Sequence, residues 1–287
     1  MTERLSTTAS VTLSYRFGSR RYEFGTRTFL MGVLNVTPDS FSDGGRYFDP
    51  EEALRRGLQM AEEGADFIDV GGESSRPGSL PVAAEEEIRR TAPVIERLAR
   101  ATDIPVSIDT YKSAVAARAL DAGATIVNDI SGLQFDPSLA AVASRHGASM
   151  VLMHIRGTPK TMQENPVYDD LMADVMERLS EGIRRATASG IDQLFVDPGI
   201  GFGKSLAHNT ELIRRLGELR SFGYPVLAGP SRKSFIGTIL GAPVERRLEG
   251  TGAAVAACIM NGADVVRVHD VKEMKQVART VDAIVRG

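Results

Sequence analysis

One complete structural unit can be read in residues 49–72, DPEEALRRGLQMAEEGADFIDVGG. Asp49 followed by Pro50 is typical of a helix start, because a carboxylate caps free N–H groups and proline fits the first turn. The amphipathic stretch after them stops at Gly64, where a left-handed C-cap is expected. The apolar run DFIDVGG, residues 66–72, then reads as a buried strand. The order is helix, glycine, strand.

The same unit repeats along the chain, with Gly123, Gly147, Gly190 and Gly262 in the place of Gly64. Strands that alternate with helices run parallel. Eight units in about 250 residues predict a (β/α)8 TIM barrel, since a doubly wound open sheet more often has five to seven strands. The expected strands are FLMGVLN (29–35), DFIDVGG (66–72), PVSIDT (105–110), TIVNDI (125–130), SMVLMH (149–154), QLFVDP (193–198), PVLAG (225–229) and DVVRVHD (264–270).

The chain ahead of the barrel has a different pattern. Residues 10–26, SVTLSYRFGSRRYEFGT, alternate in polarity around a Gly-Ser turn, which predicts a β-hairpin. We expect one α/β domain over residues 1–287, with residues 1–27 as an N-terminal hairpin extension that closes the N-terminal end of the barrel. There is no linker-like segment that would argue for a second domain.

The composition narrows the class of partner. The 287 residues are 43% hydrophobic and 25% charged, and the net charge is -3, so no basic surface for nucleic acid or membrane is expected. A small molecule held by a few placed cations is expected instead. The single cysteine, Cys258, excludes an intramolecular disulfide and fits a reducing compartment. With no membrane-length apolar stretch and no secretory signal, the cytoplasm is the expected location.

Polar residues stand at nearly every strand end. In a TIM barrel the C-terminal strand ends meet on one face, so these residues are expected to come together. Taken singly, each could be a helix cap, a turn residue or a satisfied core residue. Together they predict a functional site, formed by Asn35, Asp69 with Glu73, Asp109, Asn128 with Asp129, His154, Asp197, Lys233, and Arg267 with His269.

The types of residue in this set indicate the ligand. Asp109, Asn128 and Asp197 offer acceptors and an amide suited to a flat heterocycle with ring N–H and amino groups, such as a pterin or a purine. Positive charge for a pyrophosphate is expected from Arg76, Lys233, Arg267 and His269.

The same strand ends offer a magnesium site but no standard phosphate loop. Asn35 with Asp39 or Asp43 could give oxygens to Mg²⁺, which prefers a few protein oxygens plus phosphate. The segment DPGIGFGKS is neither a Walker A loop, which needs glycine in place of Pro198, nor a dinucleotide fingerprint, which needs glycine in place of Lys204.

Eight segments, in order and at matching intervals, resemble the motifs of the dihydropteroate synthase family. They are LNVTPDSFSDGG, DVGGESSRPG, SIDT, NDISG, LMHIRGTPKTMQ, DPGIGFGKS, GPSRKSFIG and RVHDV, and they cover the chain from about residue 29 to its end. Two positions depart from the family pattern. Ser75 stands where threonine is common, which keeps the hydroxyl but removes a methyl from the packing, and Pro230 lies at a variable place.

The resemblance implies an enzyme that condenses 6-hydroxymethyl-7,8-dihydropterin pyrophosphate with 4-aminobenzoate, giving 7,8-dihydropteroate and pyrophosphate in folate biosynthesis. An SN1-like path is chemically sensible, because the electron-rich dihydropterin can stabilise a methylene cation. The resemblance also implies Mg²⁺, a homodimer formed by the late helices, and a target for sulfonamides.

The resemblance assigns roles by position. Asp109, Asp43, Lys233 and Arg76 would be catalytic, and Asn35 with Asp43 would bind the metal. The first loop, which carries Phe41 and Asp43, would close over the bound pyrophosphate. The pterin would be bound by Asp109, Asn128, Asp197 and Lys233; the pyrophosphate by Asn35, Ser75, Arg76, Arg267 and His269; and the aminobenzoate by Phe41, Ser75, Pro77, Phe202 and Ser234.

Three alternatives stay open on the residues alone. A pterin-dependent methyltransferase shares the fold but has no pyrophosphate to hold. A Schiff-base aldolase could use Lys233, although its place beside Arg232 in a polar loop predicts no apolar surroundings that would lower its pKa. A barrel could also bind pterin without catalysis.

Overall fold

The computed structural model describes residues 13–37 and 49–286, and its central element is an eight-stranded parallel barrel. The strands pair in the order β8-β7-β6-β5-β4-β3-β10-β9, and a parallel bridge between Val196 and Val226 joins the two ends of this order. The (β/α)8 prediction is confirmed. The strands are β3 (Phe29–Asn35), β4 (Phe67–Gly71), β5 (Val106–Asp109), β6 (Ile126–Asp129), β7 (Ser149–Met153), β8 (Leu194–Asp197), β9 (Leu227–Ala228) and β10 (Val265–Val268).

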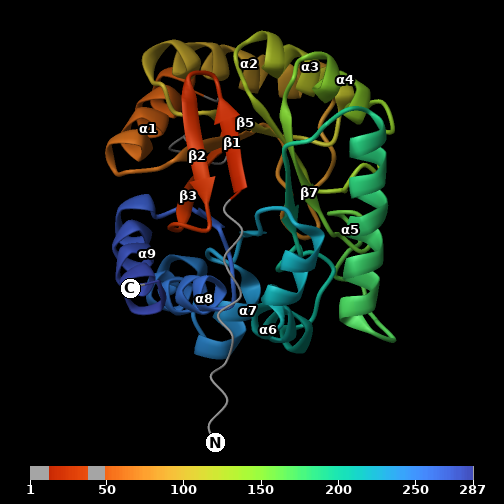
Figure 1. Cartoon of the computed structure of the whole chain (residues 1–287), viewed down its shortest axis with the longest axis vertical. Helices are drawn as coiled ribbons and strands as arrows, with labels where there is room; N and C mark the ends of the chain where they lie inside the picture. The colour runs from red at the N-terminus through yellow and green to blue at the C-terminus, as the bar shows by residue number, and fades with distance from the viewer. Residues whose placement is uncertain (1–12, 38–48, 287) are drawn as a thin grey trace, which may run out of the picture.

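Helices surround the strands in a ring, with the last helix, α9, beside the first, α1 (Figure 1). Two short 3-10 helices, Leu216–Phe222 and Val244–Arg246, lie among them. The α-helices are α1 (Pro50–Glu62), α2 (Ala84–Ala101), α3 (Ser113–Asp121), α4 (Leu139–Arg145), α5 (Leu171–Ala188), α6 (Leu206–Arg214), α7 (Ser234–Leu240), α8 (Leu248–Met260) and α9 (Val271–Val285). No helix in the described ranges is long and apolar enough to cross a lipid bilayer.

The local signals of the repeating unit are confirmed. The Asp49 carboxylate accepts a hydrogen bond from the Glu51 N–H at 2.9 Å and caps α1, which Pro50 opens. All five glycines expected at helix ends have a positive φ, from 62° at Gly147 to 109° at Gly123. The expected strand 225–229 is shorter than predicted, because Pro225 and Pro230 stand at either side of β9 and lack the N–H that a sheet needs.

Each strand has one face toward the helices and one toward the barrel interior. In β8, Leu194 and Val196 pack against the helices, whereas Phe195 belongs to the cluster inside the barrel. Side chains alternate along a strand, so Asp197 at its end faces inward as well. By the same alternation, Asn128 faces inward like Ile126, and Arg267 faces inward like Val265.

The N-terminal hairpin closes the other end of the barrel, as predicted. Strands β1 (Leu13–Phe17) and β2 (Arg20–Phe24) pair antiparallel and lie in front of the barrel strands in Figure 1. Their buried rings pack on the lowest layer of the barrel, with Phe17 5.4 Å from Phe67 and Tyr15 5.4 Å from Phe195, measured between ring centroids. The hydroxyl of Tyr15 donates to the Leu194 carbonyl at 2.7 Å. In the described part of the chain the hairpin covers this end of the barrel, so we expect ligands to enter from the opposite end.

Candidate active site at the barrel mouth

The inward-facing strand ends form one pocket at the open end of the barrel. Three apolar side chains, Ile130, Met153 and Ile200, give it a wall suited to a flat ring, and Phe202 adds an aromatic face. The polar residues predicted for the pterin are all brought together here. The lining consists of Asp109, Asn128, Ile130, Met153, Asp197, Ile200, Phe202, Gly229, Lys233 and Arg267.

Arg267 is held in the pocket by two carboxylates. Its Nε donates to Asp69 Oδ2 at 2.6 Å, and its Nη2 donates to Asp109 Oδ2 at 2.7 Å. Asp69 Oδ2 also accepts from Asn128 Nδ2 at 2.9 Å, which fixes the orientation of that amide. The sequence placed Asp69 at a strand end but gave it no role. The structure shows that this fully buried carboxylate orients two residues of the pocket.

Burial sets the protonation behaviour of the pocket acids. Removal from water raises the pKa of Asp197 to about 6, although the Gly199 N–H donates to its Oδ1 at 2.7 Å and opposes the shift. Burial also raises the pKa of Asp109, and the Arg267 guanidinium opposes that shift. Both groups are therefore sensitive to the charge of whatever enters the pocket.

Lys233 lies against an aromatic ring, and one expectation about it was wrong. Its Nζ is 4.0 Å from the centre of the Phe202 ring, and burial followed by the nearby Arg267 lowers its pKa to about 8. The sequence suggested a polar loop that would leave its pKa unchanged, but folding turns the side chain inward. The stem of Lys233 needs Gly201, because a Cβ there would lie 2.9 Å from Lys233 Cδ.

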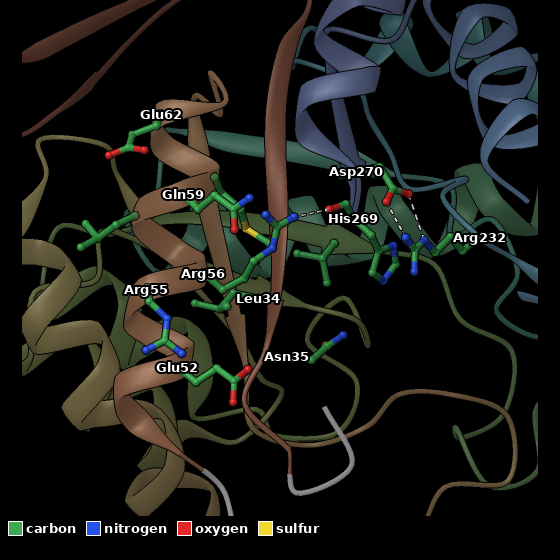
Figure 2. Close-up of a pocket in the computed structure, with 13 residues that line it drawn as sticks. Leu34, Asn35, Glu52, Arg55, Arg56, Gln59, Glu62, Arg232, His269 and Asp270 are labelled. Carbon is green, nitrogen blue, oxygen red and sulfur yellow. Dashed lines mark hydrogen bonds and ion pairs between the residues drawn. The ribbon is translucent and has the colours of Figure 1, made fainter. Parts of the chain in front are cut away.

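Asn35 and His269 line a second cavity, which lies along α1 and is also lined by Arg55 and Gln59 (Figure 2). His269 was expected to be a cation, and this is wrong for the ligand-free protein. Burial, then the neighbouring Arg267, lowers its pKa to about 3. Its Nδ1 lies 3.0 Å from the Ser231 hydroxyl, and its carbonyl accepts from Arg56 Nη2 at 3.0 Å. His269 is thus a neutral hydrogen-bonding group.

Two polar strand ends are structural and point away from the pocket. Asp129 accepts from the backbone N–H of Ser131 and Leu133, at 2.8 and 2.6 Å, because it follows Asn128 by one residue and so faces the other side. His154 lies between Asp174, 2.9 Å from its Nε2, and Lys204, whose Nζ is 2.8 Å from its Nδ1. Burial lowers the pKa of His154 to about 4, so the ring is neutral.

The residues expected around aminobenzoate are only partly assembled. Phe202 is buried in the pocket wall, whereas Ser234 is exposed at the start of α7. Ser75 is half-buried, and Arg76 and Pro77 are exposed on the loop of residues 72–83. These three residues line neither of the two cavities. Asp39, Phe41 and Asp43 lie outside the described residues.

Of the residues predicted to bind the metal, Asn35 lies within the described residues. In the described ranges no group of three or more acidic, histidine or cysteine side chains could hold a metal ion. Asn35 Oδ1 and Asp109 Oδ2 each lie 3.7 Å from the position that a Gly71 Cβ would take, so this amide oxygen is at the mouth. One amide oxygen fits Mg²⁺ in a site completed mainly by substrate phosphate and water.

A family model described as pterin binding enzyme matches residues 31–269. A dihydropteroate synthase of Synechocystis is 47% identical over 272 residues, which cover 94% of each chain. The crystal structure of Yersinia pestis dihydropteroate synthase with a sulfonamide drug complex matches with a TM-score of 0.91 at 42% identity and covers 96% of this chain and 100% of that chain. A Clostridium difficile dihydropteroate synthase, solved in the presence of pteroic acid, has a TM-score of 0.87 at 45% identity and covers 93% and 100%.

The family model alone extends from β3 to the end of β10, and its range includes Asn35, Asp109, Asn128, Asp197, Lys233, Arg267 and His269. The matches agree with the sequence resemblance and do not favour the methyltransferase or aldolase alternatives. The chain therefore belongs to the pterin-binding enzyme family, as one of its dihydropteroate synthases.

Proposed function

We propose that the barrel mouth binds 6-hydroxymethyl-7,8-dihydropterin pyrophosphate through its pterin edge and its pyrophosphate at once, and joins it to 4-aminobenzoate. The observation that carries this proposal is the convergence of Asp109, Asn128, Asp197, Lys233 and Arg267 on one pocket with an apolar wall. The direct test is to incubate the purified protein with both substrates and Mg²⁺ and to measure 7,8-dihydropteroate and pyrophosphate. Absence of both products would contradict the proposal.

The pterin edge is assigned to three residues. Asp197 accepts from the ring N–H and the amino group, and Asn128, oriented by Asp69, pairs with the adjoining edge. Lys233 donates to the carbonyl side of the ring while its stem rests on Gly201. A buried site of this kind excludes rings without the matching donors, because its own polar groups would then be left unpaired.

The reaction needs no protein nucleophile. The bond between the exocyclic methylene and the ester oxygen breaks, and its electron pair leaves with pyrophosphate. The resulting cation is shared with the dihydropterin ring, and the amine of aminobenzoate attacks it and then releases a proton to solvent. The carboxylate of Asp109 faces the ring and offsets the developing positive charge.

Arg267 connects the two halves of the substrate site. Its Nε and Nη2 are engaged by Asp69 and Asp109, so the guanidinium is positioned before any ligand arrives. Pyrophosphate then meets a preorganised cation, together with Asn35, Ser75, Arg76 and the neutral His269 as further partners. Preorganisation of this kind lowers the reorganisation needed during the reaction.

Mg²⁺ is assigned to Asn35 and to Asp43, which lies outside the described residues. When bound, the ion would supply charge that neutralises the leaving pyrophosphate. We expect chelation by EDTA to reduce product formation and added Mg²⁺ to restore it, as measured by pyrophosphate release. Full activity after removal of divalent ions would contradict this assignment, and unchanged pterin binding under EDTA serves as the control.

The aminobenzoate pocket is assigned to Phe41, Ser75, Pro77, Phe202 and Ser234. The Yersinia pestis relative was solved with a sulfonamide drug complex, and the Clostridium difficile relative in the presence of pteroic acid. Both sets of ligands fit a pocket that adjoins the pterin. Phe202 supports the assignment, because its ring lines the pterin pocket and lies 4.0 Å from Lys233 Nζ.

The activity should have a bell-shaped pH dependence. Asp197, with a pKa of about 6, and Asp109, whose pKa is also raised by burial, must both be ionised, and Lys233, with a pKa of about 8, must be protonated. Thus kcat/KM for the pterin pyrophosphate should fall by at least tenfold per pH unit on the acid side of the two carboxylates and by about tenfold per unit above the pKa of Lys233. Lys233→Arg should remove the alkaline limb, because arginine stays protonated. An alkaline limb that persists in this variant would show that another group titrates.

A homodimer and a cytoplasmic location are further parts of the proposal. Ala253 and Met260 share one face of α8 and are exposed, Met260 by 64%, and an exposed apolar face favours association. Light scattering should give the mass of two chains, and Ala253→Arg should reduce it to one. The location is supported by Cys258, which is a buried free thiol.

A further inference from the structure

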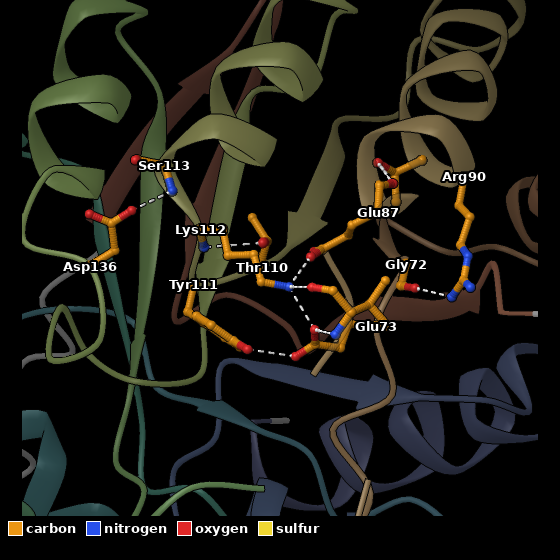
Figure 3. Close-up of polar contacts among 11 residues, drawn as sticks. Gly72, Glu73, Glu87, Arg90, Thr110, Tyr111, Lys112, Ser113 and Asp136 are labelled. Atoms are coloured by element: carbon orange, nitrogen blue, oxygen red, sulfur yellow. Dashed lines mark hydrogen bonds and ion pairs between the residues drawn. The ribbon is translucent and has the colours of Figure 1, made fainter. Parts of the chain in front are cut away.

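A buried cluster of charges lies beside the barrel mouth, under the loop of residues 72–83 that joins β4 to α2 (Figure 3). Lys112 Nζ donates to Glu73 Oε2 at 2.6 Å and to Glu87 Oε2 at 2.6 Å. The exposed fractions of these side chains are 18% for Lys112, 10% for Glu73 and 0% for Glu87. We call these three residues the Lys112 cluster. None of them lines the pterin pocket.

The Lys112 cluster joins the two ends of the loop to each other. Glu73, at the start, accepts a hydrogen bond through Oε2 from the backbone N–H of Val82, nine residues further on, at 2.6 Å. Lys112 donates a third hydrogen bond to the carbonyl of the same Val82 at 2.7 Å. Both sides of Val82 are therefore held by charged groups, and such hydrogen bonds are stronger than neutral ones.

Within the described residues, the tip of the loop has few hydrogen bonds to the rest of the barrel. Arg76, Pro77 and Gly78 are exposed, and the contact to another loop in the described structure is a hydrogen bond from the Gly78 N–H to the Pro159 carbonyl at 3.0 Å. Ser79 bonds within the loop, where its N–H donates to the Arg76 carbonyl and its hydroxyl donates to the Ser74 carbonyl. Among the described residues, the main contacts that position the tip are therefore those at the base of the loop.

The cluster is also connected to the pterin pocket. Tyr111, two residues after Asp109, donates from its hydroxyl to Glu73 Oε1 at 2.8 Å. Its ring packs edge-on against Phe135, with 5.3 Å between ring centroids, and both rings pack against the group that includes Met153 and Phe202. A shift at the base of the loop would therefore move side chains in the pocket wall.

We propose that the Lys112 cluster, with Tyr111, positions the loop of residues 72–83 so that Ser75 and Pro77 complete the aminobenzoate pocket. Lys112, Glu73 and Tyr111 are positioning residues that act through the loop and do not touch substrate. The inference rests on the proposed assignment of Ser75 and Pro77 to aminobenzoate. A buried ion cluster often adds no more stability than apolar residues of similar size would. A role in fixing the geometry of the loop therefore explains the Lys112 cluster better than a role in stability.

Two mild substitutions test this role. Tyr111→Phe keeps the ring contact with Phe135 and removes only the hydroxyl, and Glu73→Gln keeps the shape and removes the charge that holds Val82. We expect each to raise KM for aminobenzoate by about tenfold, because small misplacements of binding groups have large effects. KM for the pterin pyrophosphate and kcat should stay within about twofold. Lys112→Met leaves two buried carboxylates without a cation and is the variant at risk of unfolding.

Lys275→Met is the matched control, because Lys275 is partly buried, lies 3.6 Å from Asp66 Oδ2 and is on α9 away from the loop. It should leave both KM values unchanged. Hydrogen exchange without substrates gives a second readout, independent of activity. Amides of residues 74–80 should exchange about tenfold faster in Tyr111→Phe and Glu73→Gln, with β3 to β8 unchanged.

The outcomes separate this inference from the proposed function. Unchanged exchange and unchanged KM values in both variants would overturn the positioning role, as would an equal rise in both KM values. Lower thermal stability alone would show a purely structural cluster. If the wild-type protein forms no dihydropteroate, the proposed function fails, while the exchange result still decides whether the cluster holds the loop.

Discussion

Asp197→Asn should lower the affinity for pterin analogues by about two to three orders of magnitude while leaving the fold intact. Asp197 Oδ1 already accepts from the Gly199 N–H, so the asparagine carbonyl would keep that contact and turn its NH₂ toward the pocket. The asparagine NH₂ would then face the N–H donors of the pterin edge. Loss of a buried hydrogen-bond pairing of this kind lowers affinity by about this amount. Isothermal titration calorimetry of the variant measures the effect. Asp197→Ala should lose binding as well.

The matched control is Asp264→Asn. Asp264 is also buried, with 4% exposure, but it lies at the N-terminal end of β10 and accepts from the Val226 N–H at 3.0 Å. This variant should lose stability and retain pterin affinity. Unchanged affinity in Asp197→Asn would show that the pterin edge is bound elsewhere.

Arg267→Ala should reduce kcat/KM by about two to three orders of magnitude. Removal of one preorganised cation from a developing anion commonly costs roughly 3 to 4 kcal/mol. The change also leaves Asp69 and Asp109 buried without their shared cation, so the pKa of Asp109, already raised by burial, should rise further. Asp109 would then be less able to offset positive charge. Steady-state kinetics with saturating aminobenzoate measures the loss.

The same variant tests the coupling between the two substrates. In the proposed site, pyrophosphate and the loop of residues 72–83 both form walls of the aminobenzoate pocket. Pyrophosphate, with Mg²⁺ and a pterin, should therefore increase the affinity for aminobenzoate. Aminobenzoate should increase the affinity for these ligands by the same factor. Arg267→Ala should abolish this tightening. Arg27→Ala, which removes the ion pair with Asp66 near the closed end of the barrel, should leave the coupling intact. Equal aminobenzoate affinity with and without pyrophosphate in the wild-type protein would contradict the coupling.

Local sequence signals were sufficient for the architecture. A cap at Asp49, positive φ at the glycines and strands of two-residue periodicity all depend on neighbours along the chain, and all were confirmed. The inward direction of the pocket residues could be predicted from the two-residue periodicity of the strands. Asn128 and Asp197 stand an even number of residues after inward-facing Ile126 and Phe195, so their direction is set by the pleat.

The bounds of β9 were not predicted correctly from local signals. The sequence predicted residues 225–229, and the structure keeps Leu227–Ala228, with Val226 forming the bridge that joins β9 to β8. Prolines at 225 and 230 shorten the strand, but the bridge depends on a residue 30 positions earlier, Val196, and so on closure of the barrel.

The sequence by itself determined the repeating unit, the inward direction of the pocket residues and, through its motifs, the family. Only the tertiary structure decided the charges and partners of those residues. It placed Asp69 beneath Arg267 and Asn128, lowered the pKa of Lys233 to about 8, made His269 neutral and set Lys112 between Glu73 and Glu87. The direction of side chains repeats every two to four residues along a strand or helix, so it can be predicted from neighbouring residues in the sequence. Burial and hydrogen-bond partners come from segments far apart in the chain, such as Asp69 and Arg267, which are brought within 2.6 Å only when the barrel closes.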